Sequence, residues 1–233
     1  DDNDPTSLPD AVPDILAQIG DGVKGIRIGL DEGYVGDGVD PQLSQAVLDG
    51  VKVLEALGAQ IVNVKMPDVD KYLPGWPVLC TAEALAAHRE FYPSRRDDYG
   101  PYFSGWLDMG AKLTGADYAE ANVLRNECNG LVRLVFQDID VLACPSTIAP
   151  PHPVTLESLY GPRDENRGMA FQRFTVPYDF NGAPTLSLPC GLSSEGLPLS
   201  LQFVGKHLAE PLLCRIGNTY EQATNWNTLR PPV

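Results

Sequence analysis

The sequence predicts an α/β fold with a mixed, largely parallel sheet that is covered by helices on both faces. Three observations support this prediction. A strand, an amphipathic helix and a second strand follow one another within residues 26–66. Two short apolar runs, 183–190 and 197–204, flank a cluster of turn-forming residues, and residues 68–137 have the apolar spacing of helices.

The first part of the chain predicts a strand–helix–strand unit. Residues 26–30 (IRIGL) form a short apolar run, and Asp40 and Pro41 are typical of the cap and the first residue of a helix. One face of this helix is apolar, with Leu43, Ala46, Val47, Val51, Leu54 and Leu57. Gly58 is a helix stop, and residues 60–66 return as a strand. Such a unit predicts parallel strands with a right-handed crossover.

We interpret residues 68–137 as a helical insertion between sheet strands, with helices over 81–91, 99–112 and 116–137. The second helix has apolar and aromatic residues that either pack in a core or surround a ligand, namely Tyr102, Phe103, Trp106 and Met109. Residues 89–98 contain arginines followed by aspartates, which form either a self-neutralising surface or a substrate clamp.

A third strand is predicted over residues 138–144, directly before Ser146 and Thr147. Because ligands bind at the carboxyl ends of strands in open α/β sheets, these hydroxyls either line a pocket or cap the following loop. That loop, residues 150–168, is long enough to be a lid or a mobile segment. Residues 210–223 predict a last helix that belongs to the scaffold.

The two apolar runs near the C-terminus predict adjacent strands of one sheet. Neither run, 183–190 or 197–204, alternates between apolar and polar residues, so we expect both faces of both strands to be covered. The preceding residues, 175–184, bring polar and aromatic groups to the start of the first of these strands. They form either part of a ligand pocket or a rigid turn.

Composition excludes several classes of function. The net charge of −14 argues against binding to nucleic acid or to anionic membranes, and no apolar run approaches the roughly 20 residues of a membrane span. The first ten residues lack the pattern of a secretory signal. Five widely spaced cysteines indicate reduced thiols, so we expect a cytoplasmic protein, and the three histidines have no metal-ligand spacing. We expect no cofactor and no metal.

The C-terminal string FTVPYDFNGAPTLSLPCGLSSEGLPLSLQFVGKHLAEPLLCRIGNTYEQATNW resembles the C-terminal region of the amidase signature family. Fainter similarity extends back through residues 138–147 and 23–29. The resemblance implies part of an α/β/α sandwich and an enzyme that hydrolyses carboxamides with a Ser–Ser–Lys triad. It also implies that residues 1–233 are the C-terminal portion of a single amidase domain, with residues 1–22 as an extended lead-in.

The nucleophile of that family has no counterpart in this sequence. The family carries it on a Gly/Ser-rich segment with an upstream lysine, and this chain has no such segment. Its one Ser-Ser pair, Ser193-Ser194, lies in a turn and is interpreted as structural. The resemblance therefore implies that the catalytic residues lie on a missing N-terminal half, which would be the partner of this chain.

The resemblance assigns this half a part in substrate binding. It implies that Gln172, Thr175 and Tyr178 face a small-molecule carboxamide, together with Thr147. The resemblance also implies a difference at this position. Glutamine-handling members of the family, such as the glutaminase subunit of the tRNA-dependent amidotransferase, carry an acidic residue near the position of Gln172. A neutral Gln172 favours a neutral or aromatic carboxamide, because it offers no charge to a substrate ammonium.

Alternative functions stay open from the sequence alone. The chain is also interpreted as a glutaminase A-type subunit of a tRNA-dependent amidotransferase, or as a non-catalytic binding or assembly subunit. An independent hydrolase would need another nucleophile, and Cys190 with His207 downstream is one such pair. A half-sheet leaves an open strand edge, so the chain is expected to associate with its other half, to form a homodimer or to aggregate.

Overall fold

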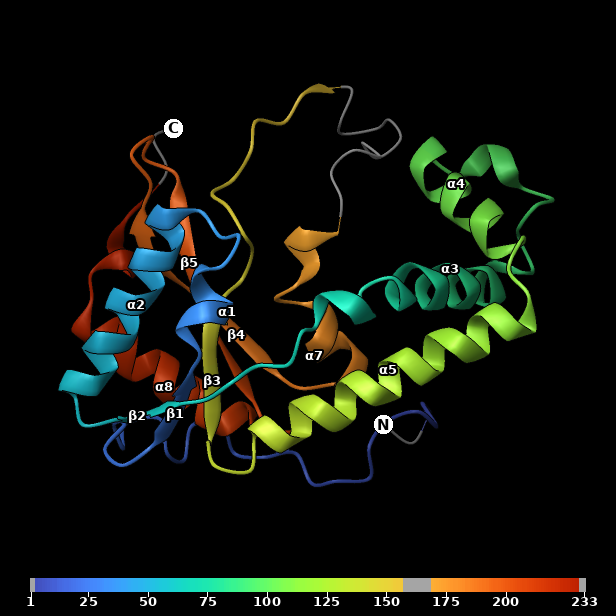
Figure 1. The fold of residues 1–233 in the computed structure, drawn as a ribbon. Helices are drawn as coiled ribbons and strands as arrows, with labels where there is room; N and C mark the ends of the chain where they lie inside the picture. Colours follow the sequence, from blue (N-terminus) through green and yellow to red (C-terminus); the bar gives the residue numbers. More distant parts are fainter. Residues whose placement is uncertain (1–2, 157–168, 231–233) are drawn as a thin grey trace.

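The structure, a computed structural model, describes residues 3–156 and 169–230. In this part of the chain five strands form one sheet in the order β2-β1-β3-β5-β4 (Figure 1). Their bounds are β1 Arg27–Leu30, β2 Gln60–Asn63, β3 Val141–Pro145, β4 Thr185–Leu192 and β5 Pro198–Gly205. β1 pairs in parallel with β2 and β3, whereas β5 pairs antiparallel with β3 and with β4. Every strand except β5 therefore points the same way, which confirms the predicted mixed, largely parallel sheet.

The strand–helix–strand unit forms as predicted. α2 (Pro41–Ala56) begins at Asp40, whose carboxylate accepts hydrogen bonds from the amides of Gln42 and Leu43. Its buried residues lie on one face, namely Leu43, Val47, Gly50, Val51 and Leu54. Gly58 follows the helix with a φ of +98°, a conformation that favours glycine, and the chain returns as β2 parallel to β1. A short helix that the sequence analysis did not predict, α1 (Glu32–Gly36), follows β1 directly.

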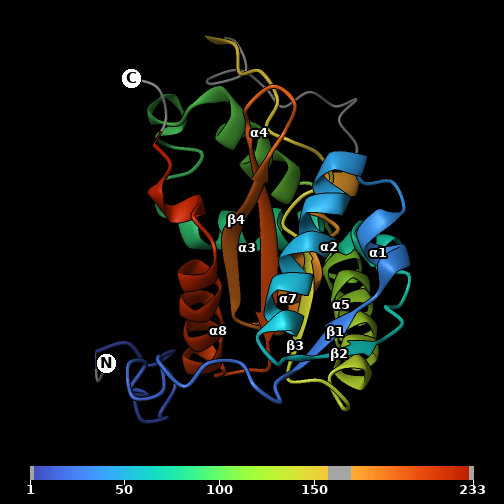
Figure 2. The same ribbon diagram turned by 90° about the vertical axis from the view of Figure 1, so that its left-hand side faces the viewer.

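Helices cover both faces of the sheet. α2 and α8 (Glu210–Ala223) lie together on one face, where Gly50 of α2 approaches Leu201 of β5 and Tyr220 of α8. A Cβ atom at Gly50 would lie 3.0 Å from Leu201, so glycine allows the helix to approach the sheet closely. α7 (Val176–Asn181) and α5 (Gly115–Val135) lie on the opposite side of the sheet (Figures 1 and 2).

The chain between β2 and β3 is helical. It forms η1 (Asp70–Tyr72), α3 (Gly75–His88), η2 (Arg96–Asp98), α4 (Pro101–Gly110) and α5. α5 begins with a reciprocal capping box between Thr114 and Asp117. α4 packs on α3 and lies far from the sheet (Figure 1). Tyr102 and Met109 of α4 are exposed, so the interpretation of the aromatic set as core is wrong for these two residues.

The two C-terminal strands form an antiparallel hairpin, as predicted, but they differ in burial. β5 is buried on both faces from Leu201 to Gly205. β4 exposes Thr185, Ser187 and Pro189 on one face. This is the same face of the sheet on which α7 lies, but α7 covers other strands. The expectation that both faces of both strands are covered is therefore wrong for β4. The reason is its position, because β4 is an edge strand and no described helix extends over this face of it.

The remaining sequence predictions concern single features. All five cysteines are free thiols, as predicted. Residues 157–168 lie outside the described part of the chain, and most of the predicted loop 150–168 falls there. None of the helices in the described ranges is long and apolar enough to span a membrane.

Candidate functional site

Three of the four predicted substrate-binding residues lie in one short segment on the side of the sheet that carries α7. η4 (Ala170–Gln172) is followed after two residues by Thr175, which precedes α7. The Thr175 amide donates to the Gln172 carbonyl at 3.1 Å, and the Tyr178 amide donates to the Thr175 carbonyl at 3.0 Å. Pro177 suits the first turn of a helix, where no amide hydrogen is needed, and Gly182 ends α7 with a φ of +69°. The local sequence therefore folds this segment into two linked turns.

Tyr178 connects this segment to the carboxyl end of β3. Its hydroxyl lies 3.8 Å from the Cys144 Sγ and 3.4 Å from the Tyr34 hydroxyl. The side chain is 2% exposed and faces the interior of the chain. Burial raises the pKa of both tyrosines well above the ordinary range and raises the pKa of Cys144 to about 12. This cluster is therefore uncharged at neutral pH.

Gln172 has an unusual polar atom. Its Oε1 is buried and has no hydrogen-bond partner among the described residues. A buried carbonyl oxygen without a donor costs about 1–3 kcal/mol relative to a paired one. An N–H group at this position would satisfy it, and a primary or secondary carboxamide supplies such a donor.

Thr147 lies two residues beyond the end of β3 and is half-buried. In the described part of the chain no hydrogen bond joins it to the other three predicted residues. The structure thus brings Gln172, Thr175 and Tyr178 together and places Thr147 on the loop that leaves the same strand end. The roles of all four in substrate binding stay a prediction.

Hydroxyl groups gather on the sheet face beside this segment. Ser146 Oγ donates to Ser200 Oγ at 2.7 Å. Ser187 pairs across the strands with Gln202, and residues paired in this way point to the same face of a sheet. Ser146 was predicted from the sequence to line a pocket or cap a loop, whereas Ser200 and Gln202 were not predicted. The polar residues of LSLQFVG, within an otherwise apolar strand, are the signal that could have identified them.

Neither Cys190 nor Ser193 has the surroundings of an activated nucleophile. Cys190 is 6% exposed, and burial raises its pKa to about 12. His207 lies beyond Val204, which pairs with Thr185 at the other end of β4, so about 15 Å of strand separates the two positions. The hypothesis of a Cys190–His207 pair is therefore wrong. Ser193 Oγ accepts hydrogen bonds from the amides of Glu195 and Leu197, which confirms that the Ser-Ser pair is structural.

No lysine in the described ranges is hydrogen-bonded to the Ser146–Ser200 pair. Nor do the described residues contain a group of three or more His, Cys, Asp or Glu side chains arranged to hold a metal ion. A cavity of about 220 Å³ lies between α1, residues 65–70 and Arg173. None of the four predicted residues lines it, and its two cations, Lys65 and Arg173, are paired with Asp31 and Asp70.

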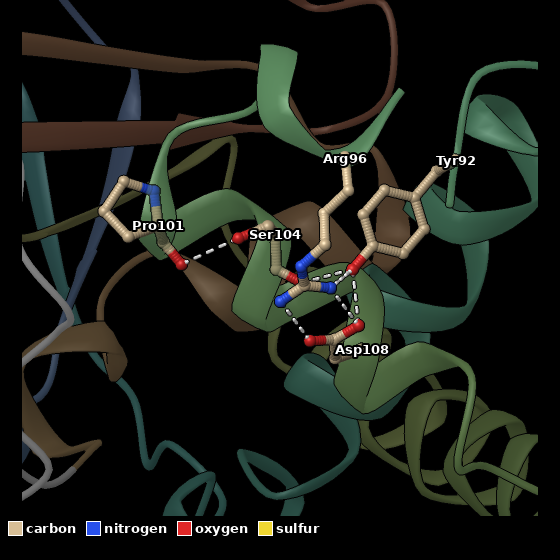
Figure 3. A network of polar contacts seen from close by, with 5 residues as sticks. All are labelled: Tyr92, Arg96, Pro101, Ser104 and Asp108. Atoms are coloured by element: carbon tan, nitrogen blue, oxygen red, sulfur yellow. Dashed lines mark hydrogen bonds and ion pairs between the residues drawn. The ribbon is translucent and has the colours of Figure 1, made fainter. Parts of the chain in front are cut away.

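The charged run 89–98 forms a local surface network and no clamp around a site. Arg95 pairs with Asp98, three residues along the chain. Arg96 makes two parallel hydrogen bonds, each of 2.7 Å, with the Asp108 carboxylate, and the Tyr92 hydroxyl contacts both groups (Figure 3). This arrangement agrees with the self-neutralising surface that was one of the two interpretations of the sequence.

Comparison with known proteins places the chain in a family. The family model named Amidase matches residues 1–214. An amidase of Pseudomonas putida is 35% identical over 233 residues, covering 99% of this chain and 50% of that protein. The A-type subunit of the glutamyl-tRNA(Gln) amidotransferase of Thermosynechococcus vestitus is 30% identical, covering 100% of this chain and 52% of that protein.

Solved structures agree with the fold. A bacterial aryl acylamidase of the amidase signature family superposes with a TM-score of 0.80 and 22% identity, covering 98% of this chain and 49% of that one. The chain thus spans about half the length of the relatives and structures that it matches. Its sheet, with helices on both faces, agrees with the α/β sandwich of those structures. This polypeptide therefore belongs to the amidase signature family of hydrolases.

Proposed function

We propose that residues 1–233 are the C-terminal half of an amidase that hydrolyses the C–N bond of a carboxamide to a carboxylate and ammonia or an amine. The observation that carries this proposal is the match of the whole chain to only about half of each amidase relative. The described residues agree with it, because they include no lysine-activated serine pair. The Ser–Ser–Lys machinery would then lie on a segment outside these residues.

The role proposed for this half is one wall of the acyl pocket. Gln172 and Thr175 would contact the substrate amide, with Tyr178 beneath them and Thr147 beside them. The unpaired Gln172 Oε1 supports this role, because it is a buried acceptor that an amide N–H would satisfy. An uncharged acceptor favours a neutral or aromatic carboxamide over one with an ammonium group next to the reacting bond.

The partner proposed for this chain is the N-terminal half of the amidase fold. β4 is an edge strand and exposes Thr185, Ser187 and Pro189, so a further part of a sheet or a covering segment fits there. We expect this protein to act in the cytoplasm on a small molecule, without nucleic acid or membrane as a partner. A homodimer of the isolated chain would be an alternative use of the same edge.

A second candidate function is that of the glutaminase component of a tRNA-dependent amidotransferase. Relatives that carry the name of this component are 27–31% identical to the chain, and they also match over about half their length. The two candidates differ in substrate, since the glutaminase component would take glutamine. A non-catalytic binding or assembly role is the third alternative, and it predicts no turnover by the complete protein.

A serine-directed fluorophosphonate probe tests the division of labour. The isolated chain of 233 residues should remain unlabelled, whereas the complete polypeptide that contains it should be labelled on a serine outside these residues. Thiol-directed or serine-directed labelling within residues 1–233 that abolishes amide hydrolysis would contradict the proposal. Absence of amide turnover by the complete protein would favour the assembly role.

A substitution at Gln172 tests the substrate class. Gln172→Glu should raise the KM for a neutral aryl carboxamide and lower the KM for glutamine, because a carboxylate can pair with the substrate ammonium. Gln172→Ala should raise the KM for the neutral amide only. Preference of the unaltered enzyme for glutamine would favour the second candidate function.

A further inference from the structure

Two consecutive backbone carbonyls between Gln172 and Thr175 are held by side chains from distant parts of the chain. The Tyr34 hydroxyl, on α1, donates to the Arg173 carbonyl at 2.8 Å. The Gln202 Nε2, on β5, donates to the Phe174 carbonyl at 2.7 Å. The two donors are 139 and 28 residues away from their acceptors in the sequence. They therefore attach the segment to two different layers of the fold.

Both donors are themselves fixed by their surroundings. Tyr34 is 8% exposed and Gln202 is 3% exposed, so both side chains are largely shielded from water. The Tyr34 ring also packs edge-on against the Phe174 ring, with centroids 4.8 Å apart. In such a poorly solvated place a hydrogen bond resists opening more than it does at the surface, because the separated groups stay unpaired.

A charged contact holds the outer side of the same segment. The Arg173 guanidinium donates to both oxygens of the Asp70 carboxylate, from Nε at 2.9 Å and from Nη2 at 2.6 Å. Its Nη1 donates to the Asp37 carbonyl, which follows α1. The backbone of residues 173 and 174 is thus held from inside by two neutral donors and from outside by one bidentate ion pair.

We propose that Tyr34 and Gln202 are positioning residues for substrate recognition. They fix the backbone between Gln172 and Thr175, and so fix where the Gln172 Oε1 and the Thr175 hydroxyl meet the amide. This inference rests on the proposed function, because it assigns a purpose to the site described there. Neither residue touches the substrate in this scheme, and each acts through the carbonyl that it holds.

The test uses the complete amidase that contains this chain and compares three variants. Tyr34→Phe and Gln202→Met each remove one donor while keeping the size of the side chain nearly the same. Tyr220→Phe is the matched control. It removes the hydroxyl of a tyrosine that is 1% exposed, but Tyr220 is on α8, on the opposite face of the sheet from the segment.

The first measurement is amide hydrogen exchange of residues 173–176. Exchange should become several-fold faster in Tyr34→Phe and in Gln202→Met, and should stay unchanged in Tyr220→Phe. The second measurement is steady-state hydrolysis of a neutral aryl carboxamide. KM should rise about two- to tenfold in each of the first two variants, as expected for one lost hydrogen bond, with kcat nearly unchanged.

A double-mutant cycle separates positioning from general destabilisation. In a Gln172→Ala background, Tyr34→Phe should raise KM less than it does in the unaltered enzyme, because the contact that it positions is already absent. A merely structural role predicts additive effects on KM, or an equal effect of Tyr220→Phe, and either result would overturn the inference.

Failure of this inference differs from failure of the proposed function. If Gln172→Ala raises KM but Tyr34→Phe and Gln202→Met do not, the site stands and the positioning role is wrong. If Gln172→Ala and Thr175→Ala both leave KM unchanged, the proposed substrate wall is wrong and the inference falls with it. Faster hydrogen exchange without any change in KM would also overturn the positioning role.

Discussion

Two polar networks in this molecule use similar groups in opposite surroundings. The network of α4 joins Arg96, Asp108 and Tyr92 at the surface, with the charged side chains 47% and 41% exposed (Figure 3). The network beneath η4 and α7 joins Tyr34, Tyr178, Cys144 and Gln202 inside the fold, where all four are buried.

Because their surroundings differ, only one of the two networks is expected to fix the position of a backbone segment. A surface network gains little from each contact, because water and salt compete for the same groups. A buried neutral network gains no charge attraction, but an unmade bond there leaves a polar atom unsatisfied. We therefore expect the α4 network to adjust the stability of a helical hairpin and the inner network to determine the position of the segment with Gln172.

The largest expected effect comes from the core of the inner region. Phe174 is fully buried, and Phe174→Ala should lower the free energy of unfolding by about 3–5 kcal/mol, because it leaves a cavity beside Tyr34. Phe103→Ala, in the half-buried aromatic group of α4, should cost only about 1–2 kcal/mol. Urea unfolding of the purified chain measures both. Equal losses would remove the distinction between the two regions.

The next effect concerns the cap of the helix that carries Tyr34. Asp31 Oδ1 accepts from the amides of Gly33 and Tyr34, and Oδ2 accepts from the amide of Met66. An asparagine offers an oxygen on one side only, so Asp31→Asn should cost about 2 kcal/mol by leaving one buried amide opposed by an NH2 group.

Asp40→Asn is the matched control for that cap. Asp40 uses a single oxygen for the amides of Gln42 and Leu43 at the start of α2, and asparagine caps helices about as well as aspartate. The change should stay within about 0.5 kcal/mol in the same urea experiment. A loss at position 40 as large as that at position 31 would contradict the two-oxygen explanation.

A third comparison sets one bidentate ion pair against another. Arg173 and Arg96 each make two parallel hydrogen bonds with a carboxylate, but the Arg173 side chain is 17% exposed. Arg173→Lys should cost about 1 kcal/mol, because lysine keeps the charge but cannot make the paired contact. Arg96→Lys should lower the free energy of unfolding by less. Its effect should also disappear first as sodium chloride is raised from about 0.05 to about 1 M, because the Debye length falls to about 3 Å at the higher concentration.

The smallest effect is a pH dependence at the surface network. Hydrogen bonds from Arg96 and Tyr92 lower the pKa of Asp108 from 3.8 to about 2. The pKa is lower in the folded state, so Asp108 contributes stability above about pH 4 and loses this contribution as the pH falls towards 2. The difference in stability between the unaltered chain and Asp108→Asn should therefore shrink over this range.

Asp97→Asn is the matched control for the charge change, because it removes a carboxylate outside the network. The Asp97 carboxylate is exposed and makes no ion pair with Arg96 in the described structure. Its replacement should change the free energy of unfolding at neutral pH by no more than about 0.5 kcal/mol. If the difference in stability between the unaltered chain and Asp108→Asn stays the same down to about pH 2, the charge of Asp108 does not stabilise the fold. The network would then stabilise it through packing alone.

The regular elements followed from local patterns. The capped start of α2, the helix stop at Gly58 and the two apolar runs of the C-terminal hairpin each encode a local conformation, and these predictions were correct. The start of one helix differs from its prediction. α3 begins at Gly75, six residues before the predicted start at 81, and Pro77 lies in its first turn, where proline is tolerated.

The candidate site likewise has features that follow from local sequence and features that depend on distant residues. Gln172, Thr175 and Tyr178 are close in sequence, so one motif located them together, and their role in substrate binding stays a prediction from the family resemblance. Sequence alone did not indicate the partners of this segment. Its inner donors come from α1 and from β5, and the exposed face of β4 depends on its place at the edge of the sheet.

Most of the helices and strands, and the resemblance to the family, could be recognised from the amino-acid sequence, which also contains no Gly/Ser-rich segment of the family's kind. The folded arrangement was needed to show that Tyr34 and Gln202 hold the carbonyls of Arg173 and Phe174, and that Cys190 and His207 lie far apart. Caps, turns and periodicity act over a few neighbouring residues, so they can be recognised from a short stretch of sequence. Buried hydrogen bonds instead depend on the register and stacking of whole layers, which place residues 139 positions apart within 2.8 Å.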